Sequence, residues 1–317
     1  MSLVKNEWIK IFSKVSTYIF IAFLLLAALG TAVIDYKLSP DQSKDWKQEV
    51  KADIKEQQKA LEATDISDDE KAMIMDDIEV SKHLLADNIN PDLNTNWTYM
   101  AQWTMSLTSF VTLFVVIVCS SLVSSEFSDG TIKQLLIRPY KRWKILLSKY
   151  ITSLLFAALL LSSLVIFSYL IGIIFFGNGS YSDKILDPSA FGEFKPVVVG
   201  SYFVDMMVYW IPGFLVITTI AFMLSTLFKN QALAVGISIF ILFASSPLNM
   251  VIQSFIGKYE WLKFVLFPHL DLRVYISGPM EMFDGATLGF SMGVLGIYYL
   301  IFLALTFFFF QKKDITN

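Results

Sequence analysis

The stretch with the clearest potential for a specific interaction runs from Ser124 to Tyr150 and separates two of the longest uncharged runs in the chain. Glu126 and Asp129 stand where a short helix would begin, and the positive end of a helix dipole favours such acids. The apolar residues that follow have the i, i+3, i+4 spacing of one helix face: Ile132, Leu135 and Leu136. Pro139 stops this helix, and a basic cluster lies around it. The pattern is typical of an amphipathic helix that docks in a groove of a cytosolic protein.

Motifs for the common kinds of catalytic site are absent from the sequence. A phosphate-binding loop is missing, because Gly257-Lys258 lacks both the leading glycine and the following Ser or Thr. Neither H-E-x-x-H nor G-x-S-x-G occurs. Cys119 is the only cysteine, which excludes an intrachain disulfide and a multi-cysteine metal site, and His269 has no other metal ligands at suitable spacing. We therefore expect a chain that is not an enzyme and holds no cofactor or metal of its own.

The elements around the basic stretch are long apolar runs. The chain has 317 residues, 55% of them hydrophobic, and six runs exceed the roughly 18 uncharged residues typical of a spanning helix. Backbone amides in hydrocarbon must be satisfied internally, so these runs should be helices. They are Thr17–Ile34, Met100–Ser124, Ile151–Phe176, Met206–Phe228, Ala232–Ile256 and Ala286–Gln311. The sequence predicts an all-α membrane protein with six transmembrane helices.

Basic residues beside the spans predict the orientation. With the amino terminus inside, the cytoplasmic face collects Lys5, Lys10, Lys14, Lys133, Arg138, Lys141, Arg142, Lys144, Lys149, Lys229, Lys312 and Lys313. The opposite short loops hold fewer bases than acids, so both termini should be cytoplasmic. Charges are segregated by segment rather than pooled, which argues against a nucleic-acid partner. The compact size and the Lys-rich external insertion favour the plasma membrane of a Gram-positive bacterium.

Residues 1–36 and 37–98 form the first two expected domains. An apolar stripe at Val4, Trp8, Phe12 and Val15 predicts an amphipathic helix lying among the lipid headgroups, although these residues could merely anchor the first span. The charged stretch 37–98 predicts an extracellular helical hairpin, whose second helix starts with the capping box Ser67-x-x-Glu70. The hairpin could meet a partner or be a solvated insertion without a ligand. Trp97, Tyr99 and Trp103 follow, as in an aromatic belt.

Residues 99–317 form the third expected domain, with spans two to six and the cytoplasmic loop 125–149. Ser245-Ser246-Pro247 should interrupt the fifth span near its middle. The region 257–285 is too apolar for a free loop and too short for another pair of spans. Re-entrant helices at the outer leaflet account for both facts. Asp271 and Arg273 should pair there, and Asp205 should be a wetted carboxylate at the outer interface.

The pattern E-x-x-x-G-T-I-K-x-L-L-x-R-P-x-x-R, from Glu126 to Arg142, resembles the loop between the second and third spans of ABC-2 type transporter permeases. Phe310–Ile315 resembles that family's aromatic-x-basic-basic-Asp ending, and the six-span layout is similar too. The resemblance implies a coupling helix that contacts a cytosolic ABC ATPase, present in two copies that hold ATP and Mg. It assigns this coupling role to Glu126, Asp129, Gly130, Thr131, Leu135, Arg138 and Arg142.

The same resemblance implies an exporter permease that pairs with a second, identical or homologous permease among the membrane lipids. Its cargo would be amphipathic or hydrophobic, such as a peptide antibiotic, a toxin or a lipid-like compound. Spans two and five would line the translocation path, which implies Phe110, Phe114, Phe240 and Phe243 as lining residues. The alternative is a sensing or scaffold subunit whose hairpin binds a ligand without transport. An ion-coupled carrier is disfavoured, because the spans have no ionisable residue at mid-membrane depth.

Overall fold

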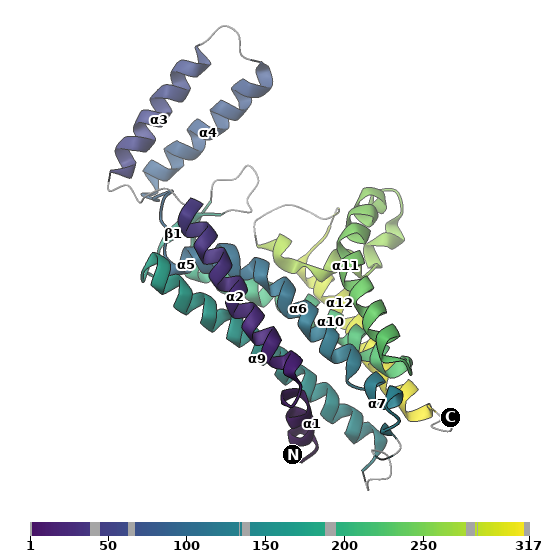
Figure 1. Ribbon diagram of the computed structural model, residues 1–317. Helices are drawn as coiled ribbons and strands as arrows, with labels where there is room; N and C mark the ends of the chain where they lie inside the picture. The colour runs from purple at the N-terminus through teal and green to yellow at the C-terminus, as the bar shows by residue number, and fades with distance from the viewer. Residues whose placement is uncertain are drawn as a thin grey trace. The chain divides into compact units, whose positions relative to one another are not determined.

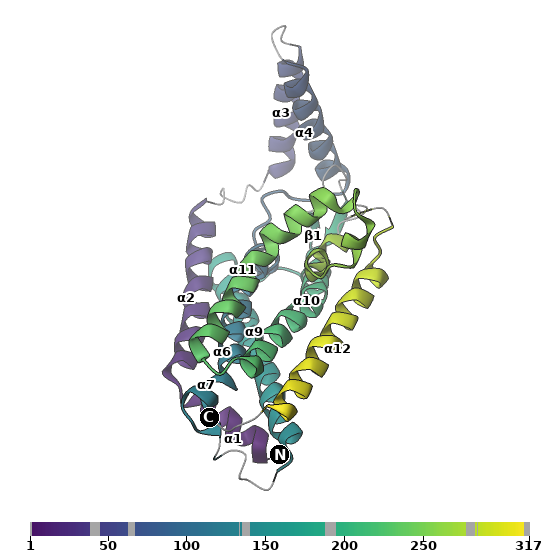
Figure 2. The same cartoon turned by 90° about the vertical axis from the view of Figure 1, so that its right-hand side faces the viewer.

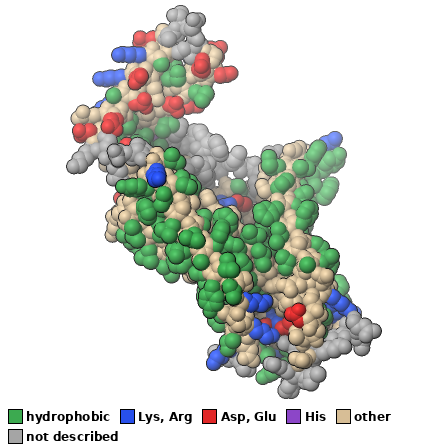
Figure 3. Space-filling model, viewed as in Figure 1, with side chains coloured by type: hydrophobic (Ala, Val, Ile, Leu, Met, Phe, Trp, Pro, Cys, Tyr) green, Lys and Arg blue, Asp and Glu red, His purple; other side chains and the backbone are tan. Residues whose placement is uncertain are grey.

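The computed structural model describes residues 2–38, 45–62, 67–132, 134, 140–187, 195–276, 283 and 285–313. Six of its helices are long and apolar enough to cross a membrane. They are Val15–Leu38, Asn96–Ser128, Arg142–Phe176, Val199–Leu227, Gln231–Ile256 and Leu288–Lys312. Each contains or closely matches one predicted run, so the expectation of an all-α membrane protein with six apolar spans is confirmed. On the face shown in Figure 3, hydrophobic side chains cover the spanning helices, whereas charged side chains crowd the hairpin α3–α4.

The chain forms two compact units. The first consists of Met1–Ala27, Met105–Phe167 and Met206–Asn317, and the second of Ala28–Thr104 and Ser168–Asp205. The boundaries between these units fall inside several of the long helices. The expected domain boundaries after residues 36 and 98 follow hydropathy instead, and they stay a prediction.

The second unit carries the helical hairpin. Helix α3 (Trp46–Leu61) packs against α4 (Asp68–Ala86), as Figure 1 shows. The amide of Glu70 donates to Ser67 Oγ, and the amide of Ser67 donates to the Glu70 carboxylate, so the predicted capping box is confirmed. The strands β1 (Lys184–Leu186) and β2 (Pro196–Val198) pair antiparallel in the same unit.

The second span begins in this unit as α5 (Asn96–Tyr99) and the π-helix η1 (Met100–Thr104). Tyr99 is fully buried. Its hydroxyl donates to the carbonyl of Ala28 at 2.7 Å and lies 2.9 Å from Thr31 Oγ1, so the ring joins this span to α2 (Val15–Leu38). Tyr99 thus serves helix packing, whereas a residue of an aromatic belt would expose its ring.

The first unit contains α1 (Ser2–Phe12), α6 (Met105–Ser121), α7 (Ser124–Ser128), α11 (Gln231–Ile256) and α12 (Leu288–Lys312), with most of α9 (Arg142–Phe176) and α10 (Val199–Leu227). The expected interruption of the fifth span is wrong, because α11 continues through Pro247 as one helix (Figure 2). A membrane helix tolerates such a proline where neighbouring groups satisfy the freed carbonyl.

Three short 3₁₀-helices occupy part of the region 257–285. They are η2 (Glu260–Phe264), η3 (Phe267–Leu270) and η4 (Leu272–Tyr275), and residues 277–282 and 284 lie outside the described part. His269 of η3 is fully buried, with its ring nitrogens 2.7 Å from Ser291 Oγ of α12 and 2.9 Å from the carbonyl of Lys263. The imidazole therefore holds η2, η3 and α12 together. The helical character predicted for this region is confirmed, whereas its depth in a membrane stays a prediction.

Gly213 allows η3 to approach α10. A Cβ at this position would lie 1.8 Å from the carbonyl oxygen of Leu270, an atom of the main chain that cannot rotate away. Gly213→Ala should therefore lower the free energy of unfolding by about 1–3 kcal/mol, as overpacking does. Thermal unfolding of the purified full chain measures this change.

Gly236→Ala is the matched control, because a Cβ there meets nothing within 4 Å and Gly236 lies inside α11. Alanine should leave the unfolding temperature unchanged or raise it, since it favours the helix. Equal effects of the two replacements would contradict the close packing of η3 on α10.

Candidate functional site

The candidate site is α7, the one-turn helix that follows the end of α6. The amides of Val123 and Ser124 both donate to Ser225 Oγ of α10, at 2.9 and 3.0 Å. The first amides of a helix have no partner within it, and here one buried hydroxyl from another span supplies it. The start of α7 is thereby fastened to α10.

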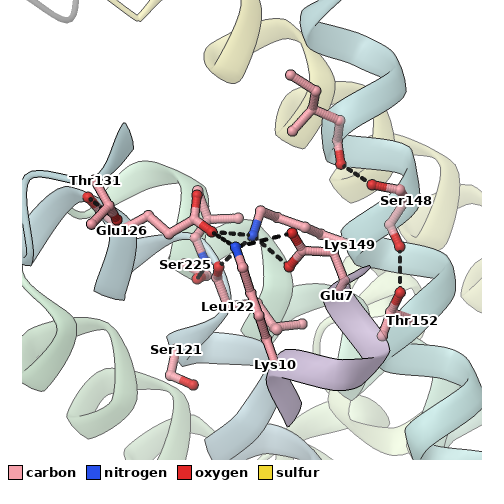
Figure 4. A network of polar contacts seen from close by, with 12 residues as sticks. Glu7, Lys10, Ser121, Leu122, Glu126, Thr131, Ser148, Lys149, Thr152 and Ser225 are labelled. Carbon is pink, nitrogen blue, oxygen red and sulfur yellow. Dashed lines mark hydrogen bonds and ion pairs between the residues drawn. The ribbon is translucent and has the colours of Figure 1, made fainter. Parts of the chain in front are cut away.

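Lys149 of α9 is the centre of a buried ion cluster beside α7 (Figure 4). Its ammonium lies 2.6 Å from Glu126 Oε1 and 2.8 Å from Glu7 Oε2, and it donates to the carbonyl of Leu122 at 3.2 Å. Lys149 is 1% exposed, Glu7 5% and Glu126 8%. Charges buried to this extent require partners, so α1, α7 and α9 are held to one another.

Lys10 of α1 makes the cluster electrically neutral. Its ammonium lies 3.0 Å from Glu126 Oε1 and 3.3 Å from Glu7 Oε1. Burial works against the charged form of Lys10, but the carboxylates of Glu126 and Glu7 outweigh it and raise the pKa of Lys10 above its ordinary value of 10.5. Glu126 Oε2 is buried with no hydrogen-bond partner among the described residues. The carboxylate is therefore stabilised mainly through Oε1, which contacts the ammonium groups of Lys149 and Lys10.

The far end of α7 is bound to the turn between α10 and α11. Ser128 Oγ donates to the carbonyl of Lys229 at 3.1 Å and accepts from the amide of Gln231 at 3.0 Å. Asn230 Oδ1 accepts from the amide of Leu233 and completes the start of α11. One small helix is therefore bonded to α1, α9, α10 and the beginning of α11.

Cations close the carboxyl ends of two neighbouring helices. Lys313 follows α12; its ammonium donates to the carbonyls of Thr226 and Leu227 at the end of α10 and lies 4.2 Å from the ring centroid of Phe127 in α7. Arg142 Nη1 donates to the carbonyls of Gln311 and Lys313. Both arrangements suit the negative end of a helix dipole.

The structure separates the residues to which the resemblance assigned one coupling role. Glu126 lies in the first turn of the short helix α7, as predicted, but its pairs with Lys149 and Lys10 bury its side chain. Asp129, the C-cap of α7, is exposed, as are Gly130 and Thr131.

Gly130 has a φ of 70°, a conformation that favours glycine, and it turns the chain away from α7. Arg142 is exposed at the start of α9. Leu135 and Arg138 lie outside the described residues.

The predicted lining residues also divide. Phe110 and Phe243 line a cavity of about 420 Å³ in the first unit. Phe114 is buried and stacks on Phe20 at 4.4 Å between ring centroids. Phe240 is 71% exposed and is not among the residues that line this cavity.

Glu7 and Lys149 are the residues that sequence reasoning missed. Glu7 is the only acid before Asp35, in a segment whose lysines drew attention instead. Lys149 directly precedes the uncharged run 150–176 but was counted with the basic cluster of the loop. A carboxylate just before the first span and an ammonium near the start of the third could have suggested a pair.

Breaking the cluster should destabilise the protein strongly. Glu126→Gln leaves Lys149 with one carboxylate, and Lys149→Met leaves two buried carboxylates with only Lys10, so each change should cost about 3–5 kcal/mol of unfolding free energy. The double replacement should cost less than the sum, since both single changes remove the same interaction. Unfolding in mixed micelles gives this double-mutant cycle.

Lys144→Met is the control, because Lys144 is an exposed lysine on the same helix and its replacement should change stability by no more than about 0.5 kcal/mol. Strict additivity of Glu126→Gln and Lys149→Met, or equal effects of Lys144→Met and Lys149→Met, would contradict the cluster.

Lys313 should have a pKa well below that of an ordinary lysine. Burial and the positive charge of Lys229 lower the pKa of Lys313 from its ordinary value of 10.5 to about 8. The folded state then binds this proton more weakly than the unfolded state, so the contribution of Lys313 to stability should rise between pH 8 and pH 10.5. Carbon-13 NMR of reductively methylated lysines should show one resonance with a midpoint near 8 that disappears in Lys313→Arg. A spectrum in which every lysine titrates near its ordinary value would contradict this.

Comparisons with known proteins place the chain in a family. Residues 71–316 match the family described as "Protein of unknown function (DUF2705)". "Uncharacterized protein YhcI" of Bacillus subtilis is 37% identical over 330 aligned residues, covering 100% of both chains. "Uncharacterized membrane protein YdbK" of the same organism is 31% identical over 228 residues, which cover 72% of this chain and 87% of that protein. The chain therefore belongs to the DUF2705 family.

Proposed function

We propose that this chain is the membrane-spanning permease subunit of an ABC exporter of the ABC-2 type. The observation that supports the proposal is the bonding of α7 to α1, α9, α10 and α11, directly before the exposed residues Asp129, Gly130 and Thr131. A force on these three residues reaches α7 within a few bonds. Because the contacts of α7 with Ser225 and Lys149 are short and buried, it passes that force to several helices together.

The proposed assembly has two such permeases, identical or homologous, and two cytosolic ATPase subunits that hold ATP and Mg. In this arrangement α1 lies among the headgroups of the cytoplasmic leaflet and both termini are cytoplasmic. The hairpin α3–α4 is extracellular, and η2–η4 form the re-entrant region at the outer leaflet. The membrane is the plasma membrane of a Gram-positive bacterium. The positive-inside distribution of Lys and Arg supports this orientation.

The proposed cargo is amphipathic or hydrophobic, such as a peptide antibiotic, a toxin or a lipid-like compound. The cavity that contains Phe110 and Phe243 supports this choice, because five aromatic and four aliphatic side chains line it beside its polar groups. The alternative is a sensing or scaffold subunit in which the hairpin binds a ligand and α7 passes the signal on without transport.

The test is purification of the tagged full chain from membranes of its native cell, with identification of any ABC ATPase by mass spectrometry and assay of its ATP hydrolysis. Asp129→Arg and Thr131→Arg change exposed side chains and should leave the fold intact. Each should lower recovery of the ATPase by about tenfold or more, because one misplaced charge in an interface costs at least about 1.4 kcal/mol.

Asp76→Arg is the matched control, since it makes the same change at an exposed position of the hairpin and should leave ATPase recovery unchanged. The proposal fails if the unaltered chain brings no ATPase, or if Asp129→Arg behaves like Asp76→Arg. Binding of a ligand to the hairpin without any stimulation of ATP hydrolysis would favour the sensing alternative.

A further inference from the structure

The cavity of about 420 Å³ in the first unit is lined by aromatic, aliphatic and hydroxyl side chains and by one ion pair. Four of its aromatic side chains come from three spans, with Phe110 on α6, Trp210 and Phe214 on α10 and Phe243 on α11. The rings of Trp210 and Phe214 are stacked with centroids 4.4 Å apart, so they form one continuous apolar face. Such a wall favours an alkyl chain over a polar cargo.

The charged part of the lining is a bidentate ion pair between Asp271 and Arg273. Arg273 Nε donates to Asp271 Oδ1 at 2.7 Å, and Nη2 donates to Oδ2 at 2.5 Å. The side chains are 46% and 31% exposed, and both line the cavity together with Asn249 and Ser246. The close contact of the Leu270 carbonyl with Gly213 fixes the backbone just before the pair. The charges are therefore held at the cavity wall rather than carried on a free loop.

An ion pair at a cavity wall selects for the charge pattern of its ligand. A headgroup with a single charge is attracted by one member of the pair and repelled by the other at nearly the same distance, so the two energies largely cancel. A headgroup with a cation and an anion can place its cation beside Asp271 and its anion beside Arg273, which makes both energies favourable.

We infer that this cavity binds a single-chain amphiphile with a zwitterionic headgroup, whose headgroup meets the Asp271–Arg273 pair while its alkyl chain lies against the aromatic wall. The volume supports one chain, because pockets for drug-sized molecules measure about 300–1,000 Å³ and this one is at the lower end of that range. The inference rests on the proposed function only in naming the cargo of the exporter; binding itself requires no ATPase.

The experiment uses the full chain in nanodiscs of phosphatidylglycerol without any ATPase partner, so its failure is separate from failure of the ATPase test. The probe is decylphosphocholine with a brominated chain, which quenches Trp210 when it occupies the cavity. The saturable component of the quenching should disappear in Trp210→Phe, whereas non-saturable quenching of the other six tryptophans by probe dissolved in the lipid should remain. Brominated decyl sulfate, decyltrimethylammonium and decyl maltoside should bind about tenfold more weakly or worse, the ratio that one lost charge contact of about 1.4 kcal/mol produces.

Asp271→Asn and Arg273→Gln should each weaken binding of the phosphocholine probe by about tenfold and reduce its advantage over the other headgroups. Asp205→Asn and Lys258→Gln remove one acid and one base that do not line the cavity, and they should leave binding unchanged. Equal affinity for all four headgroups would overturn the inference, since it would show simple partition of the alkyl chain. Headgroup selectivity is measured on the unaltered protein, so it decides the question even if a variant does not fold.

Discussion

The ammonium of Lys149 lies almost completely buried between the carboxylates of Glu7 and Glu126, and the arrangement of the first unit depends on its staying there. Removing a charge from water costs several kcal/mol, and only close partners of opposite sign offset that cost. If α1, α7 or α9 moved alone, at least one buried charge would lose its partner. The three helices are therefore constrained to move together, which is the property required of a lever that connects a surface loop to the spans.

Basic residues at this end of the unit, from which the orientation is predicted, also bind the ends of helices. Each of three helix ends offers carbonyls to a cation: Leu122 after α6 to Lys149, Thr226 and Leu227 of α10 to Lys313, and Gln311 of α12 to Arg142. The last carbonyls of a helix have no partner within it, so the same charges that satisfy the positive-inside rule also complete the helices. A count of lysines and arginines therefore predicts an orientation without revealing which of them are structural.

The parts of the structure that could be predicted depend on local rules. Long uncharged runs become helices because hydrocarbon leaves the backbone no other choice, and this sufficed for all six spans. The Ser67 capping box and the Asp271–Arg273 pair join residues two or three positions apart, which a reader of the sequence can see.

The rest depends on contacts between residues far apart in the chain. Glu126 was expected at the start of a short helix, but its burial could not be predicted because its partner Lys149 is 23 residues away and belongs to another span. The continuity of α11 through Pro247 was missed because proline signals a break only when its surroundings are unknown. The cavity combines side chains from α6, α10, α11 and the 3₁₀ segments, and no single stretch of sequence announces it.

The ion cluster also has a consequence for biosynthesis. Glu7 precedes Lys149 by 142 residues, so a growing chain exposes the carboxylate of α1 long before its main partner has been translated. Until α9 arrives, that carboxylate can be stabilised only by water and by Lys10, three residues later on the same helix. The buried pairing of Glu7 with Lys149 must therefore wait until α9 has been translated.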